Sequence, residues 1–342
     1  VSNGADYQYN ITHLATQPDK LGGELGYYLR NEMIPKLEEG MKSRGDEIIP
    51  YVNVFNTPPD EKGYTQFMDS PRYSSGYTAL FGTIGFTIET HMLKPFDVRV
   101  PATYHFIETI LEIAKRDAVK IKVKRKKVAT QSIAGTMVPI GWELDKTKVR
   151  TLEFKGYEAL YKKSEVTGFD RLYYDREKPF TKQIPYYNGF ATTLEVKAPK
   201  AYIIPQAWSE VVHALQINDV KMSLVAKDTT ILVEQYHIDD YNTSKNPYEA
   251  HYPHNSTKVT AQKREVAFRK GDYFIPVDQP AGRFLVELLE PQAVDSYFNW
   301  NYFDTILQQK EYFSPYVFEE IAAKLLAEKK ALKARNIIAQ GK

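Results

Sequence analysis

Residues 85–96 of this 342-residue chain read GFTIETHMLKPF. The run Phe86-Thr87-Ile88 has the β-branched and aromatic composition of a short strand, and a turn containing His91 and Pro95 follows it. Glu89 therefore stands at the end of a mostly apolar strand. One interpretation is a strand-end residue that reaches solvent or caps the next helix. The other is a catalytic base, held by the strand at the edge of an open site.

The segments around this strand predict an α/β fold for residues 1–120. Residues 21–45 have apolar side chains three and four positions apart, which indicates an amphipathic helix: Leu25, Tyr28, Leu29, Met33 and Leu37. EIIPYVNVF (47–55) is a strand candidate. Residues 100–116 predict a second helix, whose apolar face would contain Tyr104, Ile107, Ile110, Leu111 and Ile113. Helices that alternate with strands favour a mixed sheet with covered faces.

The pattern changes at the basic stretch IKVKRKKVATQ (121–131), where alternating Lys and Val predict an exposed strand. From there to residue 290, short strand-like runs recur between Pro, Gly, Asn and Asp turns, which is typical of a β-rich, sandwich-like domain. QAWSEVVHALQIN (206–218) is a helical insert. Residues 291–342 form a predicted helical C-terminal segment, from SYFNWNYFD (296–304) through PYVFEEIAAKLLAEKKALKAR (315–335).

Composition limits the possible partners. The chain has 45 Lys and Arg against 43 Asp and Glu, so its charge gives no reason to expect nucleic acid as a partner. No apolar run approaches the roughly 20 residues of a membrane helix, so we expect no membrane insertion. Cysteine is absent, so a metal would need His, Asp or Glu ligands. The 25 tyrosines suit contacts with sugars or peptides without proving them.

The sequence contains no complete catalytic motif. There is no His-Glu-x-x-His pair, no Gly-rich phosphate loop and no Gly-x-Ser-x-Gly elbow. The pair His251 and His254, in HYPH, has a metal-like spacing, but Pro253 lies between them and a loop is predicted there. We therefore interpret this pair as an unlikely metal site and expect His105 and His213 to be packing or surface residues.

Several stretches resemble the zinc carboxypeptidase family, and most closely its large bacterial members with a β-rich C-terminal region. They are VSNGADYQY (1–9), PRYSSGYTALFG (71–82), GFTIETHMLKPFDVRV (85–100), PYEAHY (247–252) and the distal run 271–304. The resemblance implies a metallopeptidase that hydrolyses a peptide or amide bond in a peptide-like substrate. It also favours a periplasmic or secreted location.

The same resemblance implies where the metal ligands and the base lie. The family binds zinc through an upstream His-x-x-Glu pair and a later His that would directly precede Val1. We therefore expect this chain to be a fragment of a zinc enzyme that contains none of the zinc ligands and is inactive alone. Glu89 aligns with the family's general base, which takes a proton from zinc-bound water and passes it to the leaving amine.

The PRYSSGY loop precedes the strand as the family's substrate-closing tyrosine loop does. Tyr73 and Tyr77 are both candidates for substrate binding, and the spacing to Glu89 does not choose between them. The guanidinium of Arg72 has the geometry to pair with a terminal carboxylate, or else with an ordinary surface acid. His91 is interpreted as structural.

A second hypothesis is a non-catalytic binding module with a degenerate peptidase-like region. The aromatic cluster SYFNWNYF (296–303) and the high tyrosine content are compatible with it. The codons upstream of Val1 would discriminate between the hypotheses, because an enzyme needs a His there and a His-x-x-Glu pair further back. The sequence does not distinguish exopeptidase, endopeptidase and amidase action, and it does not determine the oligomeric state.

Overall fold

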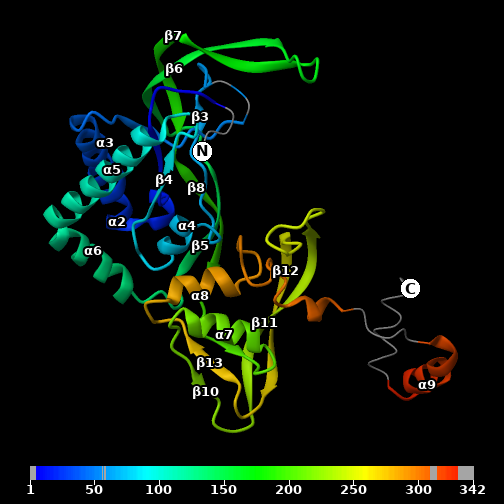
Figure 1. The fold of residues 1–342 in the computed structure, drawn as a ribbon. Helices are drawn as coiled ribbons and strands as arrows, with labels where there is room; N and C mark the ends of the chain where they lie inside the picture. Colours follow the sequence, from blue (N-terminus) through cyan, green and yellow to red (C-terminus); the bar gives the residue numbers. More distant parts are fainter. Residues whose placement is uncertain (1–4, 56, 58, 309–313, 330–342) are drawn as a thin grey trace. The chain divides into compact units, whose positions relative to one another are not determined.

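The computed structural model describes residues 5–55, 57, 59–308 and 314–329, and the chain divides into two compact units, residues 1–302 and 303–342 (Figure 1). The helices of the first unit are α1 (Pro18–Leu21), α2 (Gly23–Tyr28), the π-helix η1 (Leu29–Met33), α3 (Ile34–Ser43), α4 (Ser74–Ala79), α5 (Phe96–Arg116), α6 (Ala118–Thr130), α7 (Ser209–Ile217) and α8 (Gly282–Leu289). Its strands are β1 (Ile11–Ala15), β2 (Ile48–Pro50), β3 (Tyr64–Thr65), β4 (Phe86–Thr90), β5 (Met137–Leu144), β6 (Val149–Lys163), β7 (Asp170–Tyr187), β8 (Phe190–Lys197), β9 (Ala201–Ile204), β10 (Ser223–Leu224), β11 (Thr229–Thr243), β12 (His254–Phe268) and β13 (Tyr273–Pro276).

A three-stranded sheet in the order β2-β1-β4 holds the strand that carries Glu89. The central strand β1 is buried along its whole length, and it pairs parallel to β2 and antiparallel to β4. Because β1 has a hydrogen-bonded neighbour on each side, its backbone polar groups are satisfied within the sheet. The strands predicted at 47–55 and at 86–88 are both present, although β2 is limited to three residues.

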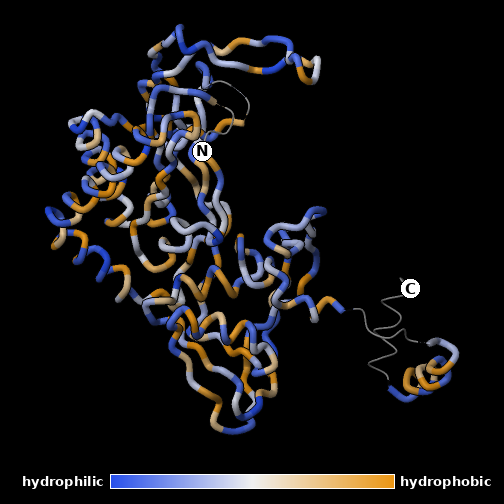
Figure 2. The backbone as a smooth tube through the Cα atoms, viewed as in Figure 1, coloured by the Kyte–Doolittle hydropathy of each residue, from blue (hydrophilic) through white to orange (hydrophobic). Residues whose placement is uncertain are grey.

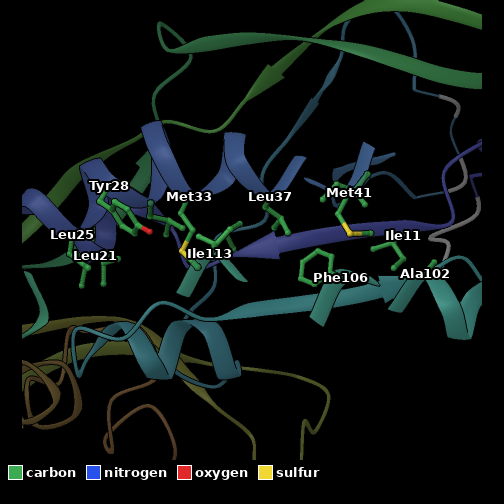
Figure 3. Close-up of a cluster of buried hydrophobic side chains, with 13 residues drawn as sticks. Ile11, Leu21, Leu25, Tyr28, Met33, Leu37, Met41, Ala102, Phe106 and Ile113 are labelled. Carbon is green, nitrogen blue, oxygen red and sulfur yellow. The ribbon is translucent and has the colours of Figure 1, made fainter. Parts of the chain in front are cut away.

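The amphipathic helix predicted for residues 21–45 is present as α2, η1 and α3 in succession. All five residues of its predicted apolar face are buried. They belong to one cluster with Ile11 of β1 and with Ala102, Phe106 and Ile113 of α5, and Figure 3 labels all of these side chains except Leu29. The three- and four-residue spacing therefore predicted the buried face correctly.

The apolar face predicted for α5 is correct only in part, because Ile113 is buried and Ile110 packs against the core, whereas the other three predicted residues are exposed. Tyr104, Ile107 and Leu111 are 62%, 47% and 63% exposed, whereas the buried residues are Ala102, Phe106, Thr109 and Ile113. Both sets have helical spacing, so the pattern alone does not choose between them. The choice depends on α3, whose Gly40 lets the Thr109 side chain approach closely.

The exposed strand predicted at residues 121–131 is also wrong, because these residues belong to helix α6. Lys, Arg and Ala are good helix formers, and the Lys-Val alternation is too short to outweigh them. Lys120 pairs with Glu32 at 2.6 Å and Lys124 with Glu24 at 3.2 Å. These ion pairs direct the basic face of α6 toward η1 and α2.

Strands β5–β13 occupy most of the predicted β-rich region and form sheets of two or three strands, with α7 as the predicted helical insert. One sheet crosses the predicted boundary at residue 120, because β3 pairs parallel to β7 in the order β3-β7-β6. The side chains of Tyr7, Tyr9 and Ile49 pack against Phe154 and Ile184 beneath this sheet. The sandwich arrangement and the boundaries at 120 and 290 stay predictions.

The aromatic run SYFNWNYFD (296–304) does not form the predicted α-helix; residues 291–303 are mainly turns, with left-handed backbone at Asp295 and Asn301. The second unit contains a 3₁₀-helix, η2 (Asp304–Leu307), and the predicted helix α9 (Pro315–Glu328), whose hydrophobic composition is visible in Figure 2. The rest of that predicted helix, beyond Lys329, lies outside the described residues. Within the described ranges, no helix is both long and apolar enough to cross a membrane.

The β3–β7 pairing gives the first stability prediction, Gly63→Ala. Gly63 precedes β3 with a φ of +71°, and a Cβ there would lie 1.8 Å from the carbonyl oxygen of Pro185. We expect the substitution to lower the free energy of unfolding by about 2 kcal/mol, through backbone strain and the displaced strand.

Gly45→Ala is the matched control in urea unfolding. Gly45 has a φ of +83° but nothing within 4 Å of its Cβ position, so only the backbone strain should appear, at about 1 kcal/mol. Equal losses in the two variants would contradict a role for the Pro185 contact.

Candidate functional site

Glu89 lies next to the last residue of β4, and every residue of that strand is half-buried. It stands opposite Thr12 of the buried strand β1 in the antiparallel register. Side chains directly opposite each other on an antiparallel pair lie on the same face of the sheet. Glu89 and Thr12 therefore share a face of the sheet.

Polar groups surround Glu89 on this face. Thr12 is fully buried, and Tyr7 is 2% exposed. Burial raises the pKa of the Tyr7 phenol, and the nearby negative charge of Glu89 adds to this increase, whereas the neighbouring Thr12 hydroxyl acts in the opposite direction. The carboxylate thus lies beside a neutral phenol and a hydroxyl, in partly desolvated surroundings.

His91 supports this cluster from a fully buried position. Its Nδ1 accepts a hydrogen bond of 3.1 Å from the Leu93 backbone N–H, so the hydrogen of the neutral ring is on Nε2, which lies 3.3 Å from Asp6 Oδ1. Burial opposes ionisation of Asp6, but the contacts with His91 and Arg176 lower its pKa overall. The His91 ring also packs edge-on against Tyr7, at 4.4 Å. These contacts agree with the structural interpretation of His91.

Arg72 is paired with an acid of its own chain. Its Nε lies 2.8 Å from Asp295 Oδ1, its backbone N–H donates to Oδ2 at 3.0 Å, and its Nη2 also contacts Oδ1. The guanidinium carbon lies 5.0 Å from the ring centres of both Tyr248 and Trp300. The Asp295 side chain is 1% exposed and that of Arg72 is 26% exposed. The observed ion pair is thus partly buried and differs from the ordinary surface pair considered as the alternative, while the substrate-binding role of Arg72 stays a prediction.

Arg72 and Tyr77 line one cavity of about 470 Å³, here called the aromatic cavity. Its walls contain six aromatic rings: Tyr77, Tyr248, Phe284, Tyr297, Trp300 and Tyr302. The Tyr77 hydroxyl donates to Asn218 Oδ1, at the end of α7. Tyr73 instead lines a neighbouring cavity of about 320 Å³, together with Lys20 and Trp142. The two tyrosines of the PRYSSGY segment therefore line different cavities.

Glu89 lines neither of these cavities. Helix α4, which contains Tyr77, lies near the opposite end of β4, and the Thr16 hydroxyl bridges the two segments. This hydroxyl donates a hydrogen bond to the Ser75 carbonyl at 3.2 Å and accepts one from the Gly85 N–H at 2.9 Å. Gly85 directly precedes β4, so Glu89 is about 13 Å further along the extended chain. Arg72 and Tyr77 come together, therefore, while Glu89 stands apart from them.

No group of three or more His, Asp or Glu side chains with metal-binding geometry is present within the described part of the chain. His254 is buried, with Nδ1 2.9 Å from the Thr243 hydroxyl and Nε2 3.2 Å from Asn301 Nδ2. His251 packs edge-on against Trp300 at 5.3 Å. The two histidines of HYPH thus have separate surroundings.

His13 is a buried polar residue that the sequence interpretation did not single out. It is 3% exposed in β1, lines a further cavity of about 390 Å³, and neither ring nitrogen has a hydrogen-bond partner among the described residues. The alternation along ITHLA places it on the same face as Ile11, and this signal could have identified it as a core histidine. Asp295, by contrast, lies 223 positions from Arg72 in the sequence, and no sequence pattern near either residue indicates that they pair.

His13 leads to a prediction on pH dependence. Burial lowers the pKa of its imidazole to about 4, and the positive charge of Arg150 contributes. Below about pH 6.5 the unfolded chain takes up a proton on this residue that the folded chain does not, so stability decreases as the pH falls. We expect His13 to account for a loss of about 2 kcal/mol in the free energy of unfolding between pH 7 and pH 5.

Urea unfolding of the wild type and of His13→Leu at the two pH values measures this contribution. The variant should lose correspondingly less stability on acidification. The same pH dependence in both proteins would show that His13 titrates alike in the folded and unfolded chains.

Comparison with known proteins finds partial similarity to carboxypeptidases. Over 118 residues the chain is 25% identical to Carboxypeptidase 2 of Trichophyton tonsurans and, equally, to Carboxypeptidase 2 of Trichophyton equinum. The match covers 33% of this chain and 22% of each relative, so the chain spans about a fifth of the length of these relatives. No family model and no solved structure matches the chain. The similarity relates about a third of the chain to carboxypeptidases at low identity.

Proposed function

We propose that this chain is part of a peptidase of the carboxypeptidase type and that Glu89 is its general base. Three observations support the proposal: the partial similarity to Carboxypeptidase 2, the family resemblance of the segments around Glu89, and the position of Glu89. The position carries most weight. Glu89 is a half-buried residue near the end of a strand, close to the buried Tyr7 and opposite the buried Thr12, so its surroundings are partly shielded from water.

The proposed role of Glu89 is to move one proton in two steps. Its carboxylate accepts a proton from water as the water oxygen bonds to the carbonyl carbon of the substrate. It then donates that proton to the leaving nitrogen as the carbon–nitrogen bond breaks. The products are a carboxylic acid and an amine, and Glu89 returns to its ionised form. Peptides and amide-bearing peptides are the proposed substrates.

Zinc, which the resemblance implies, does not fit the described residues, because no three suitable donors come together in them. We propose that the zinc ligands of the intact enzyme belong to sequence outside these 342 residues. No step of the reaction is therefore assigned to the metal here.

A non-catalytic binding module is the second candidate. The aromatic cavity favours it, because most of its wall comes from residues after 200 and Glu89 takes no part in it. On this hypothesis the peptidase-like region serves as a scaffold.

Incubation of the full-length protein with a mixture of peptides, followed by mass spectrometry, tests the proposal. Half of the peptides should have a free C-terminal carboxylate and half a C-terminal amide, so that the products distinguish exopeptidase from endopeptidase action. We expect cleavage that a zinc chelator abolishes. Intact peptides in every sample, from a folded full-length protein, would favour the binding module.

A further inference from the structure

The aromatic cavity brings together four segments that are far apart in the sequence. The loop before α4 contributes Arg72, the end of α7 contributes Asn218, the turn at 248–251 contributes Tyr248 and Glu249, and the region from α8 onward contributes Trp300. A space of about 470 Å³ with ring walls and a few polar groups has the size and the lining of a small-molecule site.

Arg72 fixes two of the rings. Its guanidinium carbon lies 5.0 Å from the centre of each ring, over a face of Tyr248 and of Trp300, whose centres are 6.0 Å apart, and Asp295 holds it through Nε and Nη2. The two rings are therefore positioned before any ligand binds. The third nitrogen, Nη1, has no hydrogen-bond partner in the described part of the chain, which leaves a donor at the cavity.

Backbone strain is concentrated around the same cavity. The turn Tyr248–His251 is closed by hydrogen bonds in both directions, and its central residues, Glu249 and Ala250, have φ values of +48° and +65°. Such values normally require Asn or Gly, and each costs about 1 kcal/mol or more in other residues. The turn places Tyr248 6.0 Å from the Trp300 ring. Strain of this kind is often retained at functional sites.

The charges of the cavity do not select a strongly ionic ligand. Arg72 and Asp295 neutralise each other, and the carboxylate left over is Glu249, which is exposed at the turn and has no ion pair with a described residue. A cationic ligand would find one face of Tyr248 and one face of Trp300 already covered by the Arg72 guanidinium. An aromatic side chain would cover Arg72 without giving its Nη1 a hydrogen-bond acceptor.

We infer that the aromatic cavity is a carbohydrate-binding site that takes one pyranose ring of a neutral saccharide. A pyranose has flat C–H faces, which pack on aromatic rings, and hydroxyl groups that both donate and accept hydrogen bonds. Its hydroxyls can accept from Arg72 Nη1 and donate to Glu249, while a C–H face packs against the ring walls. This inference does not depend on the proposed peptidase function.

Titration of the full chain with maltotriose, cellotriose and chitotriose tests the inference, with tryptophan fluorescence as the readout. The chain has three tryptophans, at positions 142, 208 and 300. We expect saturable binding of at least one trisaccharide. Trp300→Phe should weaken it about tenfold and remove most of the fluorescence change. Trp208→Phe is the matched control, because Trp208 precedes α7 at the end opposite Asn218, and binding should be unchanged.

Glu249→Gln provides a variant without a folding risk, because the residue is exposed. Calorimetric titration should show binding weakened about threefold to tenfold through loss of a charged acceptor, with an unchanged melting temperature. The inference is wrong if none of the trisaccharides binds to the folded wild type, or if Trp300→Phe and Glu249→Gln both bind like the wild type. Binding of a tripeptide at the same tryptophan, without binding of sugars, would also overturn it.

Discussion

Glu89→Gln in the full-length protein should lower kcat for peptide hydrolysis by about 10²–10⁴-fold, the usual contribution of a general base. Glutamine keeps the shape of the side chain and its position near the end of β4, but its amide does not accept a proton at neutral pH. The measurement is the initial rate on a saturating peptide substrate. The metal content of the full-length protein should not change, because in this proposal Glu89 is a base and not a ligand.

Glu195→Gln is the matched control, because it makes the same chemical change at an exposed position in β8. Its kcat should stay within a few-fold of the wild type. If Glu89→Gln retained near-normal turnover with its metal bound, Glu89 would not be the base, and the strand-end interpretation would replace the catalytic one.

Arg72→Ala should lower the free energy of unfolding by about 3 kcal/mol, the second large effect. Removal of the guanidinium leaves the Asp295 carboxylate, whose side chain is 1% exposed, without its partner. Loss of one member of a buried pair typically costs about 3–5 kcal/mol, and the partial exposure of Arg72 places the expected cost at the lower end. Urea unfolding measures it. Arg269→Ala, at an exposed pair with Asp228, is the control and should cost less than about 1 kcal/mol.

A double-mutant cycle separates the two roles considered for Arg72. Asp295→Ala combined with Arg72→Ala should recover part of the loss, because no charge is then left buried. Burial opposes ionisation of Asp295, but the hydrogen bonds from Arg72 lower its pKa overall. The contribution of the pair is therefore present at neutral pH and should be lost as the pH falls below the ordinary carboxyl range. Unchanged stability with a raised KM in Arg72→Ala would instead support the substrate-binding role.

Parts of the candidate site were predictable because they depend on local pattern. The apolar run before Glu89 identified its strand, and the alternation of side chains along a strand places His13 on the same face of β1 as Ile11, which belongs to the core. The pairing of Arg72 with Asp295 was not predictable, because the two residues are 223 positions apart. The same holds for the aromatic cavity, whose wall joins Tyr77, Tyr248 and Trp300 from three distant segments.

The sequence by itself determined those elements whose spacing of apolar side chains is compatible with only one secondary structure and one buried face. The helix at 23–43, with its five buried apolar residues, and the strand at 86–90 are of this kind, because spacing acts through backbone geometry within a few residues. Only the tertiary structure decided which of two apolar faces of α5 is buried, that the basic stretch is a helix opposite Glu24 and Glu32, and that β3 pairs with β7. Each of these depends on the shape or charge of a partner far along the chain, and such long-range packing and ion pairs outweigh local preferences of a few tenths of a kcal/mol per residue.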